Sequence, residues 1–505
     1  MRSLHFTLIL ISLLAGTSLA LRSPGLKLAL TPAAINDFIQ HLVPQVLDQL
    51  QPLTIQNFTA GGYTISNLVI QEMFLATNAT HVEFDQGDLT FSTESFGLDA
   101  RCNLQGNLLF GLIPMNFNTG AAKNQSKLKF TVAFDYTDDE VRLLITEFEI
   151  KIQDLKFFFP QTVMGKLAST LTDLLRSPIQ SILSSVLSRQ LKTAFTAVIN
   201  QMYENIPSTM AIPKIPLGVN LTSIWVPAIS PDYILISPIG TFYNLQKPDS
   251  LPNIPEPAGS LTFNYTSEHA VQAVVTEYTI NTALHAIWET GLLSYNITQK
   301  MLPEAMPIQL NVYWLQMFVP NIGKYHSNLS AEVVLNVQAF KAPQLKITQD
   351  NLKLEAPVSI IFSAVNRDQS LSELFSLSTT LEANVNIKLS NWTVTPELIN
   401  ATFKDNTILR SKVGEIELYK IEGLLNVATM FGVPFCRLKG IKVDLPALPV
   451  VDLSDTMLRA LDGNLRIQMT PKYLPFDLMK LLGRNGNATN TTVLVEEVDY
   501  LAIDY

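Results

Sequence analysis

The segment from Pro207 to Pro257, PSTMAIPKIPLGVNLTSIWVPAISPDYILISPIGTFYNLQKPDSLPNIPEP, holds ten prolines. Proline lacks a backbone N–H and fixes φ, so this density excludes a continuous helix and central strands. We therefore expect a boundary between two domains here, over residues 207–258. Two short apolar pieces inside it, Trp225-Val226 and Ile234 to Ile236, are able to pair at a sheet edge.

The size and composition of the chain agree with two domains. Its 505 residues exceed what one hydrophobic core usually organises. Hydrophobic residues make up 47% and charged residues only 16%, against a charged share of about 25% in ordinary globular chains. Such a chain has more apolar side chains than its surface can easily display.

The N-terminus has the pattern of a secretory signal peptide. Arg2 precedes the apolar run Phe6 to Leu14, and small residues follow up to Ala20, where we expect cleavage. No later stretch reaches the roughly 18 uninterrupted apolar residues of a spanning helix. We expect residues 1–20 to be removed and the mature protein to be soluble, secreted and extracellular.

Glycosylation sequons support export independently. Eleven asparagines stand two residues before Ser or Thr, about twice the number that we expect by chance, and they are spread over both halves. The predicted glycosylation sites are Asn57, Asn78, Asn124, Asn220, Asn264, Asn296, Asn328, Asn391, Asn400, Asn487 and Asn490.

The first half reads as helix, strands, long helix. Thr31 and Pro32 suit a helix start, and an apolar stripe runs from Ile35 to Leu50, with Pro44 as a kink. Residues 127–136 and 148–152 alternate apolar and polar side chains, which predicts strands with one face inward. Helical spacing returns over residues 163–202, with Pro178 as a kink between two stretches.

The second half repeats this order. Helical spacing starts near Ser267 and continues to Leu293, alternating strands follow at 333–339 and 383–389, and another helix is expected at 416–431. Residues 483–505 carry two sequons and several acidic side chains, and we expect a mobile acidic tail there.

Enzyme and metal signatures are missing from the sequence. It contains no nucleophile turn, zinc-protease motif, phosphate-binding glycine loop or calcium loop. Cys102 and Cys436 are too far apart to indicate a disulfide framework or a zinc cluster, and we expect two unpaired, buried thiols. We predict no enzymatic activity, metal, cofactor or disulfide. A catalytic triad whose residues come together only in the folded chain remains an alternative.

Several motifs resemble one family. Ser23-Pro24-Gly25 and the segment from Gly61 to Ile70 are similar to its mature start and first strand. The join is similar to its central sheet and proline linker, and two later segments resemble its late motifs. The family is that of bactericidal/permeability-increasing protein, lipopolysaccharide-binding protein and the plasma cholesteryl ester and phospholipid transfer proteins. The segments of the join and of the second half are 218–221, 225–227, 240–243, 412–416 and 440–446.

This resemblance implies an α+β fold of two elongated barrels. Each is a twisted antiparallel sheet wrapped around a long and a shorter helix, joined by a central sheet into a boomerang. Residues 21–206 and 259–482 would form the two lipid-binding barrels. The chain departs from the family in two ways: the usual strand-to-helix disulfide lacks its cysteines, and the basic tip is reduced to Lys123, Lys127 and Lys129.

The expected function is the sheltering of acyl chains of a phospholipid or related amphiphile in apolar pockets, as carrier, transfer protein or sensor. The three lysines could meet head groups, although a solubilised hairpin end explains them as well. The predicted lining residues, for each of which core packing is an equal alternative, are Ile35, Phe38, Leu42, Val46, Val163, Leu167 and Leu171 for the first pocket, and Val271, Val275, Tyr278 and Leu284 for the second.

Two other functions remain open at this stage. One is an innate-defence protein that binds bacterial lipopolysaccharide, and the other is a structural or adhesive secreted glycoprotein. Without the leader the chain has 34 basic and 44 acidic residues, which argues against a nucleic-acid partner. We expect transient contact with membrane or lipoprotein surfaces and a monomeric state.

Overall fold

The structure is a computed structural model that describes sixteen stretches of the chain. They are residues 24–60, 62–75, 79–106, 112–119, 126–137, 140–161, 163, 165–204, 208–248, 269–302, 309–390, 393–438, 442–444, 451–452, 456–470 and 472–473. The expected signal peptide and acidic tail lie outside these residues.

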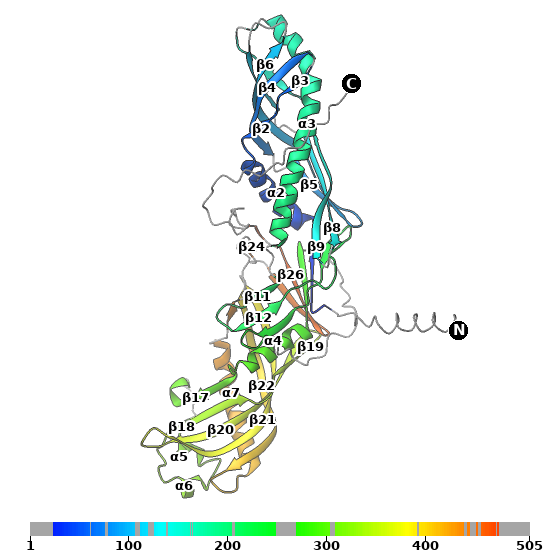
Figure 1. The fold of residues 1–505 in the computed structure, drawn as a ribbon. Coiled ribbons are helices and arrows are strands. Elements are labelled where there is room, and N and C mark those ends of the chain that lie inside the picture. The colour runs from blue at the N-terminus through cyan, green and yellow to red at the C-terminus, as the bar shows by residue number, and fades with distance from the viewer. Residues whose placement is uncertain are drawn as a thin grey trace, which may run out of the picture.

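The N-terminal half is an antiparallel sheet that curls as a half-barrel beside two helices (Figure 1). The helices are α2 (Pro32–Gln49) and α3 (Gly165–Glu204). The nine strands described are β2 (Leu53–Ile55), β3 (Phe58–Ala60), β4 (Tyr63–Leu75), β5 (Thr80–Phe84), β6 (Asp88–Gly106), β7 (Ile113–Thr119), β8 (Ser126–Thr137), β9 (Glu140–Lys151) and β10 (Lys156–Phe158).

The two helices begin and continue for identifiable reasons. The Thr31 side chain accepts a hydrogen bond from Ala34 N, and Pro32 occupies the first turn, as the sequence predicts. Helix α3 runs unbroken through Pro178, so the two stretches expected on either side of that proline form one helix of 40 residues. Its buried positions pack against the strands of this sheet.

The C-terminal half contains a second antiparallel sheet with shorter helices (Figure 1). Its seven described strands are β17 (Ser294–Ile297), β18 (Val333–Ala339), β19 (Gln344–Thr348), β20 (Asn351–Val365), β21 (Leu371–Ser390), β22 (Thr393–Ser411) and β23 (Val443–Asp444). The helices are α4 (Glu277–Glu289), α5 (Val312–Leu315), α6 (Ile322–Tyr325) and α7 (Leu418–Leu438), with a 3-10 turn at Gln299–Met301. The helix expected at 416–431 is confirmed as α7.

A six-stranded sheet joins segments from the two ends of the chain. Its order is β13 (Ala228–Ile229), β14 (Ile234–Ile236), β1 (Leu26–Leu30), β16 (Val271–Thr276), β26 (Asn464–Met469) and β25 (Thr456–Leu461). Two smaller sheets are also described. One has three strands in the order β11 (Thr209–Ala211), β12 (Leu217–Asn220) and β15 (Thr241–Asn244), and the other pairs β24 (Val451–Asp452) with β27 (Lys472–Tyr473). Residues 234–236 pair in a sheet as expected, but the expected edge position is wrong, because β14 lies between β13 and β1. Trp225 and Val226 are exposed and outside any strand.

One expected element is wrong over its first part. The helix predicted from Ser267 is strand β16 over Val271–Thr276, and only then helix α4. Strand β16 lies between β1 and β26, and Val271, Gln272, Val274 and Thr276 are all buried. Because apolar residues occupy both faces of this central strand, their spacing imitates that of a helix.

Each half has its own apolar core. In the N-terminal half, α2 and α3 bury side chains against β4, β6, β7, β8 and β9. In the C-terminal half, α5, α6 and α7 do so against β18, β20 and β21. Among the described helices, none combines the length and the apolar character that crossing a bilayer requires.

Candidate functional site

The structure brings most of the first predicted lining set together. Leu42 and Val46 on α2 and Leu171 on α3 are nearly fully buried in the N-terminal core. Ile35 and Phe38 pack against the same core but are only half-buried. The apolar face of α2 is therefore partly accessible at Ile35 and Phe38, near the start of the helix, and buried at Leu42 and Val46, near its end.

Two members of that set lie apart from the core. Leu167 is on the first turn of α3 with 39% of its surface exposed, and Val163 precedes the helix. Neither packs among the described residues of the N-terminal core. The sequence analysis included them because the apolar spacing begins at Val163, whereas the first residue of α3 that is buried in this core is Leu171.

The second predicted set divides between two places. Val275 and Leu284 pack around a small cluster of Leu345, Ile347 and Leu352. Val271 is buried in the six-stranded sheet, opposite Leu30 and Met469. Tyr278 shares a 2.8 Å hydrogen bond between its hydroxyl and that of Thr241.

A half-buried apolar face on β21 and β22 was missed as a site by the sequence analysis. It is built from cross-strand pairs, and of its ten residues only Ala383 is fully buried. The pairs are Leu381 with Phe403, Ala383 with Ala401, Val385 with Leu398, Ile387 with Pro396 and Leu389 with Val394. We call these ten residues the hairpin face.

The hairpin face connects two apolar clusters. At one end Leu381 and Phe403 pack against the core that includes Ile421 and Leu424 of α7. Further along, Val385 and Ile387 pack against the cluster that Val275 and Leu284 also contact. The opposite side of the hairpin is polar, with Lys388 paired to Glu397 at 2.7 Å. Half-buried apolar residues in a row leave apolar surface available to a ligand.

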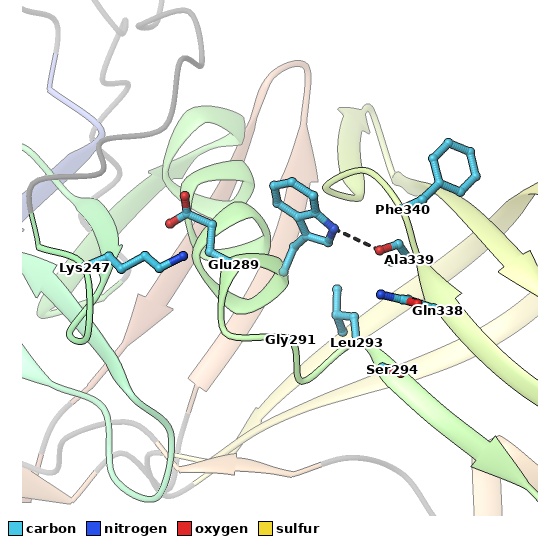
Figure 2. A pocket seen from close by; sticks show the side chains of 9 residues that line it. Lys247, Glu289, Gly291, Leu293, Ser294, Gln338, Ala339 and Phe340 are labelled. Carbon is cyan, nitrogen blue, oxygen red and sulfur yellow. Dashed lines mark hydrogen bonds between the residues drawn. The ribbon is translucent and has the colours of Figure 1, made fainter.

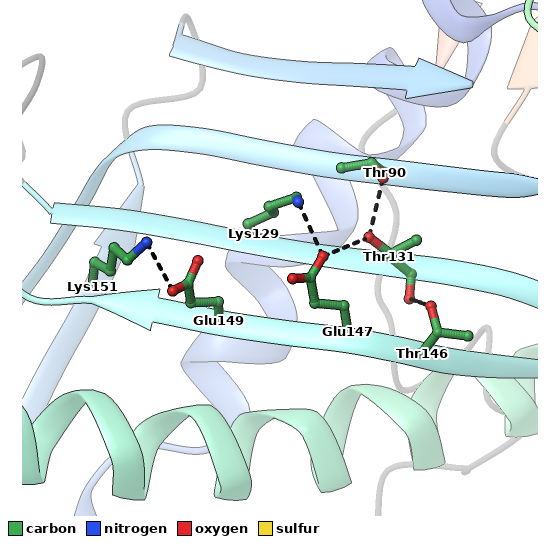
Figure 3. A network of polar contacts seen from close by, with 7 residues as sticks. All are labelled: Thr90, Lys129, Thr131, Thr146, Glu147, Glu149 and Lys151. Atoms are coloured by element: carbon green, nitrogen blue, oxygen red, sulfur yellow. Dashed lines mark hydrogen bonds and ion pairs between the residues drawn. The ribbon is translucent and has the colours of Figure 1, made fainter. Parts of the chain in front are cut away.

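The described lysines of the predicted basic tip, Lys127 and Lys129, lie on strand β8, and Figure 3 shows Lys129 beside Glu147 of β9. Lys127 Nζ is 2.6 Å from Glu94 Oε1, and Lys129 Nζ is 3.0 Å from Glu147 Oε2. The hydrogen bond and charge of Lys129 lower the pKa of Glu147. Both ammonium groups therefore have a carboxylate partner, and Lys123 lies outside the described residues. Their contact with head groups stays a prediction.

A pocket of about 490 Å³ opens where α4 ends (Figure 2). Trp288 forms one wall, and its Nε1–H donates to Ala339 O at 2.9 Å. Lys247 extends toward Glu289 at one side of the pocket, and Phe340 lies at the other side, next to Ala339. None of the predicted lining residues borders this pocket, so it is separate from both sets.

The other predicted features can be placed in part. Cys102 is a free, buried thiol, and burial raises its pKa to about 12. The described part of the chain has no group of His, Cys, Asp and Glu side chains able to hold a metal ion. Among the sequon asparagines described, Asn57, Asn296, Asn328 and Asn400 are exposed and Asn220 is half-buried. The other sequons lie outside the described residues.

Comparison with known proteins identifies relatives of this fold. Residues 238–473 match the family model described as "LBP / BPI / CETP family, C-terminal domain". The chain is 22% identical over 298 residues to a bactericidal permeability-increasing protein of Sebastes schlegelii, covering 58% of this chain and 62% of that protein. It is 23% identical over 276 residues to a lipopolysaccharide-binding protein of Rattus norvegicus, covering 55% and 56%.

A solved structure extends the likeness to the whole fold. The crystal structure of lipopolysaccharide binding protein aligns with 89% of this chain and 99% of its own, with a TM-score of 0.55 and 16% identity. In sequence, the chain spans less than two thirds of the length of the curated relatives it matches. The resemblance drawn from the sequence is confirmed to this extent: residues 238–473 match the C-terminal domain of the LBP / BPI / CETP family, and the chain has distant relatives among bactericidal permeability-increasing and lipopolysaccharide-binding proteins.

Proposed function

We propose that the chain is a non-enzymatic, secreted lipid-binding glycoprotein that buries acyl chains of a phospholipid or similar amphiphile. The half-buried hairpin face carries this proposal. It offers a continuous apolar surface beside α4 and α7, as the half-buried part of α2 at Ile35 and Phe38 does in the other half. The two halves, 21–206 and 259–482, would then be the two barrels of a tandem lipid binder.

Apolar burial alone is sufficient for such binding. Each buried CH₂ contributes about 0.8 kcal/mol, so ten methylenes supply about 8 kcal/mol before the cost of ordering the chain. The affinity therefore needs no charged contact, in agreement with the paired state of Lys127 and Lys129. The relatives' names, which refer to lipopolysaccharide and bacterial permeability, support a lipid as the ligand class.

The test is the lipid content of the glycoprotein purified without detergent. Native mass spectrometry should show bound lipid mass, and an Ile387→Trp substitution should reduce it by filling the hairpin face. Asn386→Trp is the matched control, because Asn386 is exposed on the opposite side of the same strand. A lipid-free protein that takes up no lipid from vesicles would contradict the proposal.

Binding of bacterial lipopolysaccharide in innate defence is a second candidate, favoured by the names of the relatives. Lipopolysaccharide is an anionic amphiphile, so capture through the lysines would weaken with salt. If the chain binds neutral phospholipids independently of salt and does not bind lipopolysaccharide, the second candidate is excluded and only the first proposal stands.

A further inference from the structure

Strand β9 is an edge strand whose free side is covered by helix α3. Among the described strands it pairs with β8 alone. On its other side, Ile150 N donates to Ser188 Oγ at 2.9 Å and Ile152 N donates to Ser184 Oγ at 3.1 Å. Leu143 N donates to Asn200 Oδ1 at 3.3 Å. Side chains of the helix thus take the place of a neighbouring strand.

The spacing of these donors follows from a bulge in β9. The register with β8 shifts between Thr131 and Val132, which face Glu147 and Ile145. In an antiparallel strand alternate N–H groups point to the free edge, and one extra residue reverses that alternation. Ile150 and Ile152 on one side of the bulge and Leu143 on the other therefore point to α3.

The seam between α3 and β9 borders the apolar core of the N-terminal half. Leu183 and Leu187, each one position before a seam serine, and Leu191, three positions after Ser188, are fully buried. Figure 3 shows the helix running along the strand that carries Glu147 and Glu149. Deeper in, the Phe195 ring lies 5.5 Å from that of Phe130. Separation of the seam would open this interior sideways.

We propose that the α3–β9 seam is a polar latch that opens to admit and release lipid in the N-terminal half, an inference that rests on the proposed function. Neither β9 nor α3 contains a cysteine, so no disulfide joins them. Water can replace each Ser or Asn acceptor when the seam opens, so opening leaves no N–H group unpaired. A ladder between two strands is harder to open, because many backbone hydrogen bonds must break together.

The test uses a double substitution, Ser184→Ala with Ser188→Ala. Removing the two acceptors leaves the N–H groups of Ile150 and Ile152 unpaired only in the closed state. Opening should become about fivefold more frequent for each hydrogen bond, or roughly 25-fold for the pair. The controls are Ser181→Ala with Ser185→Ala on the exposed side of α3, and Ser184→Thr with Ser188→Thr, which keeps both hydroxyls.

Three readouts separate the latch from lipid binding itself. Hydrogen exchange measures the protection of amides 150 and 152, transfer of a fluorescent phospholipid from donor vesicles measures the rate, and the bound amount at equilibrium measures capacity. The latch predicts lost protection, faster transfer and unchanged capacity in the alanine pair, with both controls like the original chain. Lost protection with an unchanged rate overturns the latch, and so does fast exchange of these amides in the original chain. No lipid bound at equilibrium, despite protected amides, overturns the proposed function together with the latch.

Discussion

Thr276 binds Gly25 across 251 residues of sequence. Its backbone N–H and its hydroxyl both donate to the carbonyl oxygen of Gly25, each at 2.9 Å. The same hydroxyl accepts from Thr279 N and so caps helix α4. One side chain therefore fixes the start of β1 and the strand-to-helix transition that the sequence analysis missed.

Replacement of Gly25 by alanine should destabilise the six-stranded sheet. A methyl group there would overlap the Ile239 carbonyl oxygen and the Thr279 hydroxyl. Backbone cannot move aside cheaply, so we expect a loss of about 1–3 kcal/mol in the free energy of unfolding, measured by urea titration. Gly423→Ala in α7 is the control, since it has open space and should gain about 0.5–1 kcal/mol. Equal effects of the two substitutions would contradict this account of Gly25.

Reversing the charge of Lys127 and Lys129 on strand β8 should have little effect on membrane binding. Lys127 and Lys129 already face Glu94 and Glu147, so the group has no net charge to attract an anionic surface. We expect Lys127→Glu with Lys129→Glu to bind anionic vesicles within about twofold of the original chain in sedimentation assays. Glu94→Gln with Glu147→Gln should likewise leave binding within about twofold, because a face that does not contact the membrane responds to neither change. A large loss on lysine reversal would instead assign these lysines to head groups.

The Cys102 thiol should resist alkylation in the folded protein. Burial raises its pKa to about 12, and the thiolate is the reactive form. A Cys436→Ser variant allows Cys102 to be followed alone. We expect iodoacetamide at pH 8 to leave it unmodified in the native state and to modify it fully after denaturation, as read by mass spectrometry. Rapid native labelling would mean that the strand β6 region opens readily.

Glu382 should make stability depend on acid pH. Lys404 Nζ lies 2.6 Å and Lys353 Nζ 3.2 Å from its carboxylate. The hydrogen bond from Lys404 is the main cause that holds the pKa of Glu382 below its ordinary value of 4.5. A lowered folded-state pKa gives stability above about pH 4.5 that is lost as the pH falls through the folded value. Thermal unfolding of Glu382→Gln should therefore differ from the original chain at pH 7 and converge with it in acid. A difference that persists unchanged at low pH would exclude this ion pair as its source.

Local signals predicted the amphipathic elements well. Thr31 and Pro32 mark the start of α2, and the alternation over 127–136 and 333–339, interrupted only at Ala133 and Val334, corresponds to β8 and β18. These elements have one buried and one wet face, which is the condition under which periodicity is informative. Strand β16 violates that condition, because it is buried on both faces.

The hairpin face on β21 and β22 was harder to predict, because the apolar pattern of one of its strands is interrupted. Residues 383–389 alternate clearly, but their partner strand carries a register shift that leaves Ile399 exposed between Leu398 and Ala401. The apolar period of β22 is broken there, so its contribution to the hairpin face is hidden in sequence. The tie between Thr276 and Gly25 is likewise a product of tertiary packing that no local pattern encodes.

Photo-cross-linking tests the burial of acyl chains most directly. A phospholipid with a diazirine near the middle of one acyl chain would be bound by the full glycoprotein, irradiated and mapped by peptide mass spectrometry. Our account predicts adducts on the hairpin face, such as Leu389 and Val394, and on the accessible part of α2 at Ile35 and Phe38. Adducts confined to exposed apolar residues such as Tyr313 and Tyr325, or none at all, would contradict it.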